Sequence, residues 1–133
     1  MVLDTSAVAA ILFDEPGAAD LERRIADDPV RLMSAATWVE ASIVIEARLG
    51  EPGSREFDLW LQRAAVEIVP VDLEQADMAR RSWRRFGKGR HPASLNYGDC
   101  FAYALAITRD DALLFTGDDF ARTDVTPVRA ASR

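Results

Sequence analysis

Three carboxylates stand among apolar residues in this sequence. Asp4 interrupts the apolar opening run MVLDTSAVAAILF, and Glu40 and Asp99 fall within segments that have the periodicity of packed helices. Burying an unpaired carboxylate costs several kcal/mol, so each of these groups needs a cation, hydrogen bonds or a proton. The three acids are therefore candidates for metal binding or acid–base chemistry.

Glu40 and Asp99 are predicted to lie on the inward faces of their helices, because residues three or four apart share a helix face. The apolar stripe expected to contain Glu40 consists of Ala36, Ile43, Val44 and Ala47. The stripe expected to contain Asp99 consists of Ala102, Tyr103 and Ala106.

A hard divalent cation would neutralise several such acids at once. The chain has one cysteine and one histidine, so the available ligands are oxygens, which favour Mg²⁺ or Mn²⁺ over zinc. Ion pairing is the alternative, with Arg31 and Arg48 as the basic residues that could reach inward.

Each acid also has a purely structural interpretation. Asp4 is a good N-cap for a helix that begins at Thr5, and Asp99 stands three residues after Asn96, as in a capping box. Asp118 and Asp119 lie in the polar segment Thr-Gly-Asp-Asp-Phe, which is typical of a turn. The sequence pattern leaves these alternatives open.

The remaining pattern predicts an α/β protein. Short apolar runs alternate with helical segments, which favours a parallel sheet covered by helices on both faces. Because ligands bind at the carboxyl ends of such strands, Asp4 and Asp118, each following an expected strand, are predicted to lie at the functional edge. The expected strands are 1–3, 30–33, 66–71, 112–115 and a last one near 126–128. The expected helices are 6–12, 17–28, 35–49, 54–65, 73–86 and 97–108, with 35–49 and 54–65 forming a hairpin.

Size and charge narrow the class of protein. A chain of 133 residues fits a single domain, predicted to span residues 1–133. The net charge of −6 argues against a generally cationic nucleic-acid coat. No apolar stretch is long enough for a membrane span, and a lone Cys100 suits a reducing compartment, so a cytoplasmic location is expected.

Four segments together resemble the PIN-domain family and, more narrowly, the VapC toxins of bacterial VapBC toxin–antitoxin pairs. They are Val2-Leu3-Asp4-Thr5-Ser6-Ala7, Val39-Glu40-Ala41, Leu95-Asn96-Tyr97-Gly98-Asp99-Cys100-Phe101-Ala102-Tyr103-Ala104-Leu105-Ala106, and Leu113-Leu114-Phe115-Thr116-Gly117-Asp118-Asp119-Phe120. The resemblance spans nearly the whole chain. It implies a PIN-like three-layer α/β/α fold with a parallel sheet of about five strands and a helical hairpin.

The resemblance also implies an activity, that of an endoribonuclease whose acids hold Mg²⁺ or Mn²⁺ in one cleft. Asp4, Glu40 and Asp99 match the family's three core acids, and Asp118 falls at the fourth position, with Asp119 as the alternative. Such a site cleaves RNA by activating a metal-bound water. Thr5 and Ser6 would support the geometry of the acids.

A basic segment is the expected RNA-binding surface. Residues 80–97 contain no acid, and aromatic residues such as Trp83 stand among the cations. Arginines can bind phosphates while aromatic rings stack on unpaired bases. The alternative is a solvated helix face whose arginines pair with Asp72, Glu74 and Asp77. The basic residues, called here the basic strip, are Arg80, Arg81, Arg84, Arg85, Lys88 and Arg90.

The family resemblance further implies a homodimer and a cognate VapB antitoxin that inserts a peptide into the acidic cleft. The expected antitoxin groove lies on the helical hairpin around Trp38, Ile45, Phe57 and Trp60, with core packing as the alternative for Trp60. The strongest rival function is a PIN-fold module that binds RNA or protein without cutting. Phosphatase and nucleotide-binding alternatives lack their motifs: Ser6 stands where a second aspartate would be needed, and no phosphate-binding glycine loop is present.

Overall fold

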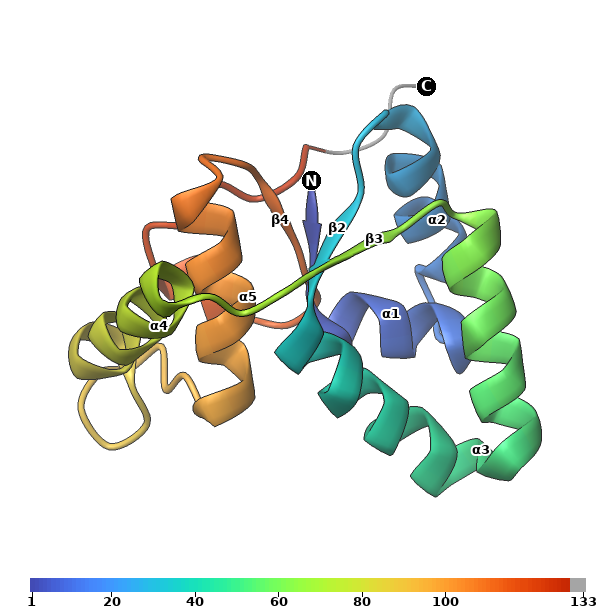
Figure 1. Ribbon diagram of the computed structural model, residues 1–133, viewed down its shortest axis with the longest axis horizontal. Helices are drawn as coiled ribbons and strands as arrows, with labels where there is room; N and C mark the ends of the chain where they lie inside the picture. The colour runs from blue at the N-terminus through green and yellow to red at the C-terminus, as the bar shows by residue number, and fades with distance from the viewer. Residues whose placement is uncertain (130–133) are drawn as a thin grey trace.

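The computed structural model describes residues 1–129 and contains a four-stranded parallel sheet in the order β3-β2-β1-β4 (Figure 1). The strands are β1 (Val2–Leu3), β2 (Leu32–Ser34), β3 (Glu67–Val69) and β4 (Leu113–Leu114). β1 is central, so the residue that follows it emerges in the middle of the sheet's carboxyl edge. The predicted α/β class with a parallel sheet is confirmed.

Helices cover both faces of this sheet. In Figure 1, α4 and α5 lie on one side of the strands, and α1, α2 and α3 lie on the other. The helices are α1 (Thr5–Leu12), α2 (Ala18–Asp27), α3 (Ala35–Arg63), α4 (Leu73–Phe86) and α5 (Tyr97–Thr108), and a short 3₁₀ turn covers Phe120–Arg122. The result is the expected three-layer arrangement.

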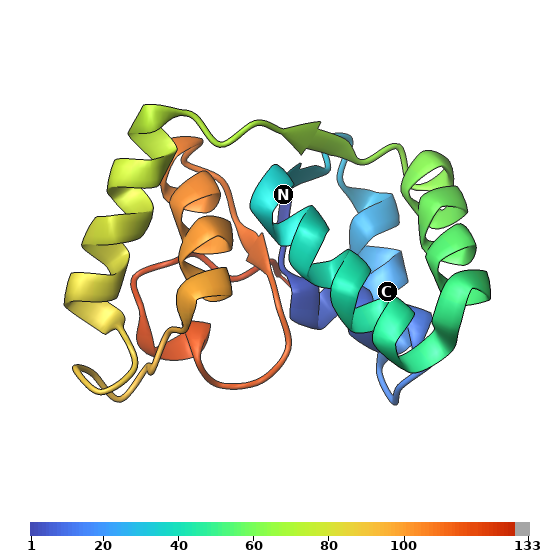
Figure 2. The same cartoon turned by 60° about the horizontal axis from the view of Figure 1, so that its bottom comes forward.

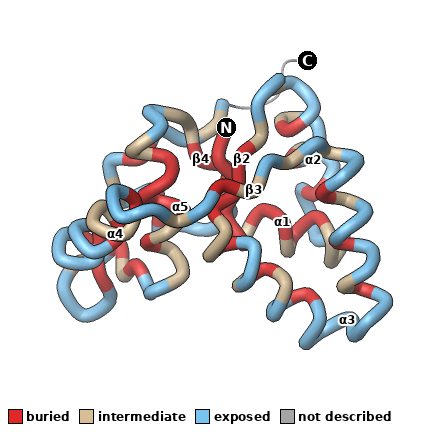
Figure 3. The backbone as a smooth tube through the Cα atoms, in the orientation of Figure 1, coloured by how far each residue is buried: buried red, intermediate tan, exposed pale blue. Residues whose placement is uncertain are grey.

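Successive side chains along the strands point to opposite faces of the sheet and belong to two separate hydrophobic cores. Val2 packs with α4 and α5, whereas its neighbour Leu3 packs with α1 and α3. Leu113 and Leu114 divide in the same way, since successive strand residues point to opposite faces. Figure 3 shows the buried backbone concentrated along the strands and on the inward faces of the helices. Both cores therefore hold the central strand in place.

The two helices predicted at 35–49 and 54–65 are present as the two arms of α3, which are separated by a sharp break in the helical backbone. Gly50 has φ of 69° and ψ of −165°, a left-handed conformation that favours glycine, and Pro52 follows it. Gly53 allows the close approach of Leu49, whose Cβ would lie 2.3 Å from an added Cβ. Figure 2 shows the two arms of α3 meeting at the bend.

The last expected strand, near 126–128, is reduced to one bridge. Pro127 pairs with Leu113 in parallel orientation, with hydrogen bonds from Leu113 N to Thr126 O (2.8 Å) and from Val128 N to Leu113 O (3.1 Å). Proline lacks the N–H that would extend this pairing. Within residues 1–129, no helix is both long and apolar enough to span a membrane.

Candidate active site

Asp4 follows the central strand directly and is almost fully buried, with 3% of its surface exposed. Its Oδ2 accepts hydrogen bonds from the Ser6 backbone N–H (3.0 Å) and hydroxyl (2.6 Å), which makes Asp4 the N-cap of α1. The capping interpretation of Asp4 is thus correct, but it uses only one oxygen. Oδ1 is buried and has no hydrogen-bond partner in the structure. Burial is the main cause that raises the pKa of Asp4.

Ser6 connects Asp4 to the loop after β4. Its hydroxyl donates to Asp4 and accepts from the Thr116 backbone N–H at 3.0 Å. β4 ends at Leu114, so Asp118 comes four residues after the strand and not directly behind it. The hydrogen bond at Thr116 nevertheless ties the start of this acidic loop to the end of the central strand.

Glu40 lies on the second turn of α3 and points toward two elements of the site. The Thr5 hydroxyl donates to Glu40 Oε1 at 2.5 Å. A Cβ on Gly98 would lie 1.8 Å from Glu40 Oε2, so the carboxylate occupies space that only glycine leaves free. Sequence reasoning did not identify Gly98 as part of the site. The available signal was a glycine in the first turn of a helix, next to a candidate acid.

The prediction that Glu40 lies on the inward apolar stripe of its helix is wrong. The face that α3 buries carries Thr37, Ala41 and Ile45, whereas Ile43 is 64% exposed and Val44 is 37% exposed. The helix has two apolar stripes, and the one that contains Glu40 faces outward. Glu40 is half-buried because Thr5 and Gly98 hold it at the boundary between the two faces.

Asp99 lies at the start of α5, where the predicted capping box with Asn96 is present. Asn96 Oδ1 accepts from the Asp99 N–H (2.9 Å), and Asp99 Oδ2 accepts from the Asn96 N–H (3.0 Å). The pKa of Asp99 is raised from 3.8 to about 6, mainly by burial and also by the negative charges of Asp4, Glu40 and Asp119, while the Asn96 hydrogen bond opposes the shift. Acids from three other parts of the chain therefore affect the pKa of Asp99.

Those contributions also bear on the choice between Asp118 and Asp119. Both residues are exposed, and the charge of Asp119 is among the causes that raise the pKa of Asp99. We use the name acid cluster for Asp4, Glu40, Asp99 and Asp119. Asp118 was the first choice for the fourth acid, and that role stays a prediction.

No arginine or lysine within residues 1–129 forms an ion pair with Asp4, Glu40 or Asp99. Arg31 instead donates to the Ile25 (2.7 Å) and Ala64 (2.8 Å) carbonyls. Arg48 lies over the Phe13 ring, 4.2 Å from its centre. The two arginines considered as partners are thus engaged elsewhere.

The acids fit a divalent cation in type and charge. Supporting features are the unpartnered Oδ1 of Asp4, the space at Gly98 and the mutual repulsion felt by Asp99. In the part of the chain that the structure describes, however, no three acid, histidine or cysteine side chains are already close enough to enclose an ion. Binding would require at least one carboxylate to move inward.

The basic strip is partly paired, and of the three acids named in its structural alternative, Asp77 is the one that forms ion pairs among the described residues. Arg80 and Arg81 share Asp77 at 3.3 and 2.9 Å, and Arg85 contacts Asp124 at 3.0 Å. These three arginine side chains remain 63–66% exposed. Among the described residues, Arg84, Lys88 and Arg90 have no ion pair, and Arg90 lies over the Trp83 ring, 4.8 Å from its centre.

The expected antitoxin groove on the α3 hairpin is not formed by the residues named for it. Ile45 and Phe57 are fully buried, and Phe57 stacks on Trp60 with ring centres 6.5 Å apart. Of the four residues, Trp38 is the exposed one, at 39%. It lies beside Val39 on the outward apolar face of the first arm of α3.

Comparison with known proteins assigns the family. The model of the PIN domain matches residues 1–125. A protein named Ribonuclease VapC from Mycolicibacterium smegmatis is 62% identical over 128 residues, covering 96% of this chain and 99% of the relative. The chain belongs to the VapC ribonucleases of the PIN-domain family. Ribonuclease VapC30 of Mycobacterium tuberculosis is 56% identical, covering 96% of this chain and 98% of the relative.

Solved structures of VapC proteins share the fold. The crystal structure of Mycobacterium tuberculosis VapC20, described as a Sarcin-Ricin loop cleaving toxin, has a TM-score of 0.76 at 18% identity and covers 96% of this chain and 98% of its own. VapBC2 from Rickettsia felis, bound to a DNA fragment from its promoter, has a TM-score of 0.73 at 15% identity and covers 96% of each chain. The PIN-type fold expected for this VapC sequence is thereby confirmed.

Proposed function

We propose that this member of the VapC ribonucleases is a metal-dependent endoribonuclease toxin that hydrolyses RNA phosphodiester bonds at the acid cluster. The observation that carries the proposal is that Asp4, Glu40 and Asp99, which come from three separate segments, are buried or half-buried and have no ion pair among residues 1–129. A protein that needed these acids only for folding would pair them with cations or place them in water.

Asp4, Glu40 and Asp99 would hold Mg²⁺ or Mn²⁺, with Asp119 or Asp118 as the fourth acid. When bound, such an ion polarises the scissile phosphate and makes a coordinated water more acidic. The chain's own contribution is positioning: Ser6 orients Asp4, Thr5 orients Glu40, and Asn96 orients Asp99. Supporting hydrogen bonds of this kind fix the directions of metal ligands.

Cleavage of total RNA tests the proposal. Purified protein, freed of any antitoxin, is expected to cut RNA with Mg²⁺ or Mn²⁺ and to stop when a chelator is added. Asp4→Asn is expected to lower the rate about 100-fold or more, because it weakens a buried metal ligand. Asp58→Asn, a surface acid on the second arm of α3, is the matched control and should cut as fast as the parent. Cleavage by Asp4→Asn at the parental rate would contradict the assignment.

The same experiment distinguishes the proposed ribonuclease from the rival function. A PIN-fold module without catalysis would bind RNA in the presence of Mg²⁺ and release no fragments. The free and buried Cys100 is consistent with the further expectation that the protein acts in the cytoplasm, where RNA is available.

We also propose a VapB-type antitoxin and a homodimer as partners. The outward apolar face of α3, with Trp38, Val39 and Ile43 at 39%, 51% and 64% exposure, is the surface in the structure that supports a protein interface. An arginine from an antitoxin peptide would find an acceptor in the acid cluster.

A further inference from the structure

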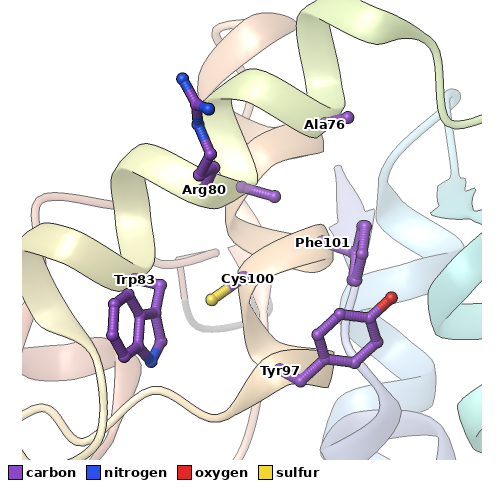
Figure 4. A pocket seen from close by; sticks show the side chains of 7 residues that line it. Ala76, Arg80, Trp83, Tyr97, Cys100 and Phe101 are labelled. Carbon is purple, nitrogen blue, oxygen red and sulfur yellow. The ribbon is translucent and has the colours of Figure 1, made fainter.

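An apolar hollow of about 400 Å³ lies between α4 and α5 (Figure 4). Its walls include Ala76, Arg80 and Trp83 from α4 and Tyr97, Cys100 and Phe101 from α5. This volume is at the low end of the range for small-ligand sites, which is roughly 300–1,000 Å³. The hollow is therefore large enough for a planar group but not for a folded segment of protein.

Aromatic rings border the hollow and are unusually exposed. Trp83 is 42% exposed and Tyr97 is 80% exposed. The Tyr97 ring meets Phe101 edge to face, with centres 4.9 Å apart and planes at 77°. Figure 4 shows Trp83 and Tyr97 on opposite helices around the same space. Exposed rings in this arrangement can stack on another planar group.

The hollow and the acid cluster both include residues from the beginning of α5. Tyr97 stands two residues before Asp99, and Cys100 directly follows it. Gly87 leaves room for the Trp83 indole beside the end of α4, because an added Cβ would lie 2.6 Å from its Cδ1. Residues that line the hollow and a residue of the acid cluster are therefore held at the same end of one helix.

The charges around the hollow select for an anion. Arg80 belongs to its wall, and Arg90 lies over the Trp83 ring. Asp77 is shared by Arg80 and Arg81, so this trio carries one excess positive charge. A planar apolar site with a cationic rim matches the base and phosphate of a single-stranded nucleotide better than an apolar peptide.

We propose that this hollow receives one unpaired nucleobase of the RNA substrate. Trp83 and Tyr97 stack on the base, Arg80 contacts an adjacent phosphate, and the neighbouring phosphodiester is presented to the acid cluster. The proposal rests on the proposed ribonuclease function. It adds the requirement that the RNA substrate is single-stranded at a fixed distance from the cleaved bond.

Binding of a short RNA with single abasic positions tests the proposal. The protein is the full chain carrying Asp4→Asn, which prevents cleavage, and the probe is an eight-nucleotide unstructured RNA in which each base is removed in turn. Removing one particular base is expected to weaken binding about 5- to 100-fold. Trp83→Ala or Tyr97→Ala should weaken binding of the intact RNA by a similar factor, and Tyr97→Phe should not.

The decisive outcome is non-additivity: the abasic RNA and Trp83→Ala together should lose little more than either alone. Leu73→Ala, an 85% exposed residue on α4, is the matched control and should bind as the parent does. A flat abasic profile, additive losses, or unchanged binding by Trp83→Ala would overturn the inference. So would a Trp83→Ala effect confined to self-association in sedimentation, which would make the hollow a protein interface. Metal-dependent cleavage by the parent, measured separately, shows whether the proposed function survives such a failure.

Discussion

The acid cluster and the basic strip differ in how far their charged groups are paired and exposed to water. In the acid cluster, carboxylates from four segments lie near one another without a cation among the described residues, and burial raises the pKa values of Asp4 and Asp99. In the basic strip, three arginines are paired and all three remain exposed to water. Exposed pairs contribute about 0–1 kcal/mol, whereas buried uncompensated charge is costly.

This difference indicates that the acid cluster is a localised binding site and that the basic strip is a charged surface. The acid cluster carries a stored electrostatic cost that a bound cation would relieve, so changes there should have large and specific effects. The basic strip is proposed to act additively through long-range attraction, so changes there should have small and salt-dependent effects.

The largest effect in this comparison is expected from Gly98→Ala. The added methyl group would overlap Glu40 Oε2 and displace the carboxylate from the acid cluster. Because alanine is the better helix former, the fold should survive. We expect cleavage to fall about 10- to 100-fold, as for other changes that misplace metal ligands. Unchanged activity with an unchanged melting temperature would remove Glu40 from the site.

A smaller effect is expected from Thr5→Val, which deletes the hydroxyl that orients Glu40 while keeping the side-chain shape. We expect about a tenfold loss of cleavage. Thr5→Ser keeps the hydroxyl and is the matched control. Equal rates for the serine and valine variants would show that this hydrogen bond does not position the acid.

Asp99→Asn should change stability in the opposite direction from activity. The pKa of Asp99 is raised from 3.8 to about 6, so its protonated form stabilises the fold. That contribution is complete below pH 3.8 and is lost as the pH rises through about 6. In metal-free buffer, Asp99→Asn should therefore unfold at a higher temperature than the parent above pH 6.

The measurement is thermal unfolding of both proteins between pH 4 and pH 8 in the presence of a chelator. Asparagine can still accept the Asn96 N–H, so the helix cap is retained. The gap between the two melting temperatures should widen up to about pH 6 and then level off. A gap that is the same at all pH values would contradict the raised pKa of Asp99.

The smallest effect is expected in the basic strip, where Arg84→Gln and Arg85→Gln form a matched pair. Arg84 has no ion pair among residues 1–129, whereas Arg85 is bound to Asp124. Arg84→Gln should weaken RNA binding and flatten its logarithmic salt slope by about 0.7, the contribution of one phosphate contact in a single strand. Arg85→Gln should change the slope less. Identical slopes for parent and both variants would remove the basic strip from the RNA-binding surface.

Sequence periodicity predicted much of the fold. The helices expected at 73–86 and 97–108 match α4 and α5. α4 has a clear apolar stripe, α5 is apolar on nearly all sides, and a side-chain cap marks the start of each. Four of the expected strands overlap β1 to β4, but their ends were predicted imprecisely, since short parallel strands merge with apolar flanks that do not pair. Pro127 shortened the last one to a bridge.

The site was predicted less completely. Asp4 and Asp99 stand out locally, one by interrupting an apolar strand and the other by its capping position. Glu40 was selected for the wrong face, because periodicity cannot tell which of two apolar stripes on α3 is buried. Gly98 matters only through its closeness to Glu40, a contact between residues far apart in sequence.

Binding of Mn²⁺ to the antitoxin-free protein tests the central claim most directly, because it requires neither RNA nor catalysis. Paramagnetic resonance of free Mn²⁺ should show loss of signal when the parent protein is added, competition by Mg²⁺, and little loss with Asp4→Asn or Asp99→Asn. Equal binding by the parent and both variants, or no binding by any of them, would contradict a metal site built from these acids.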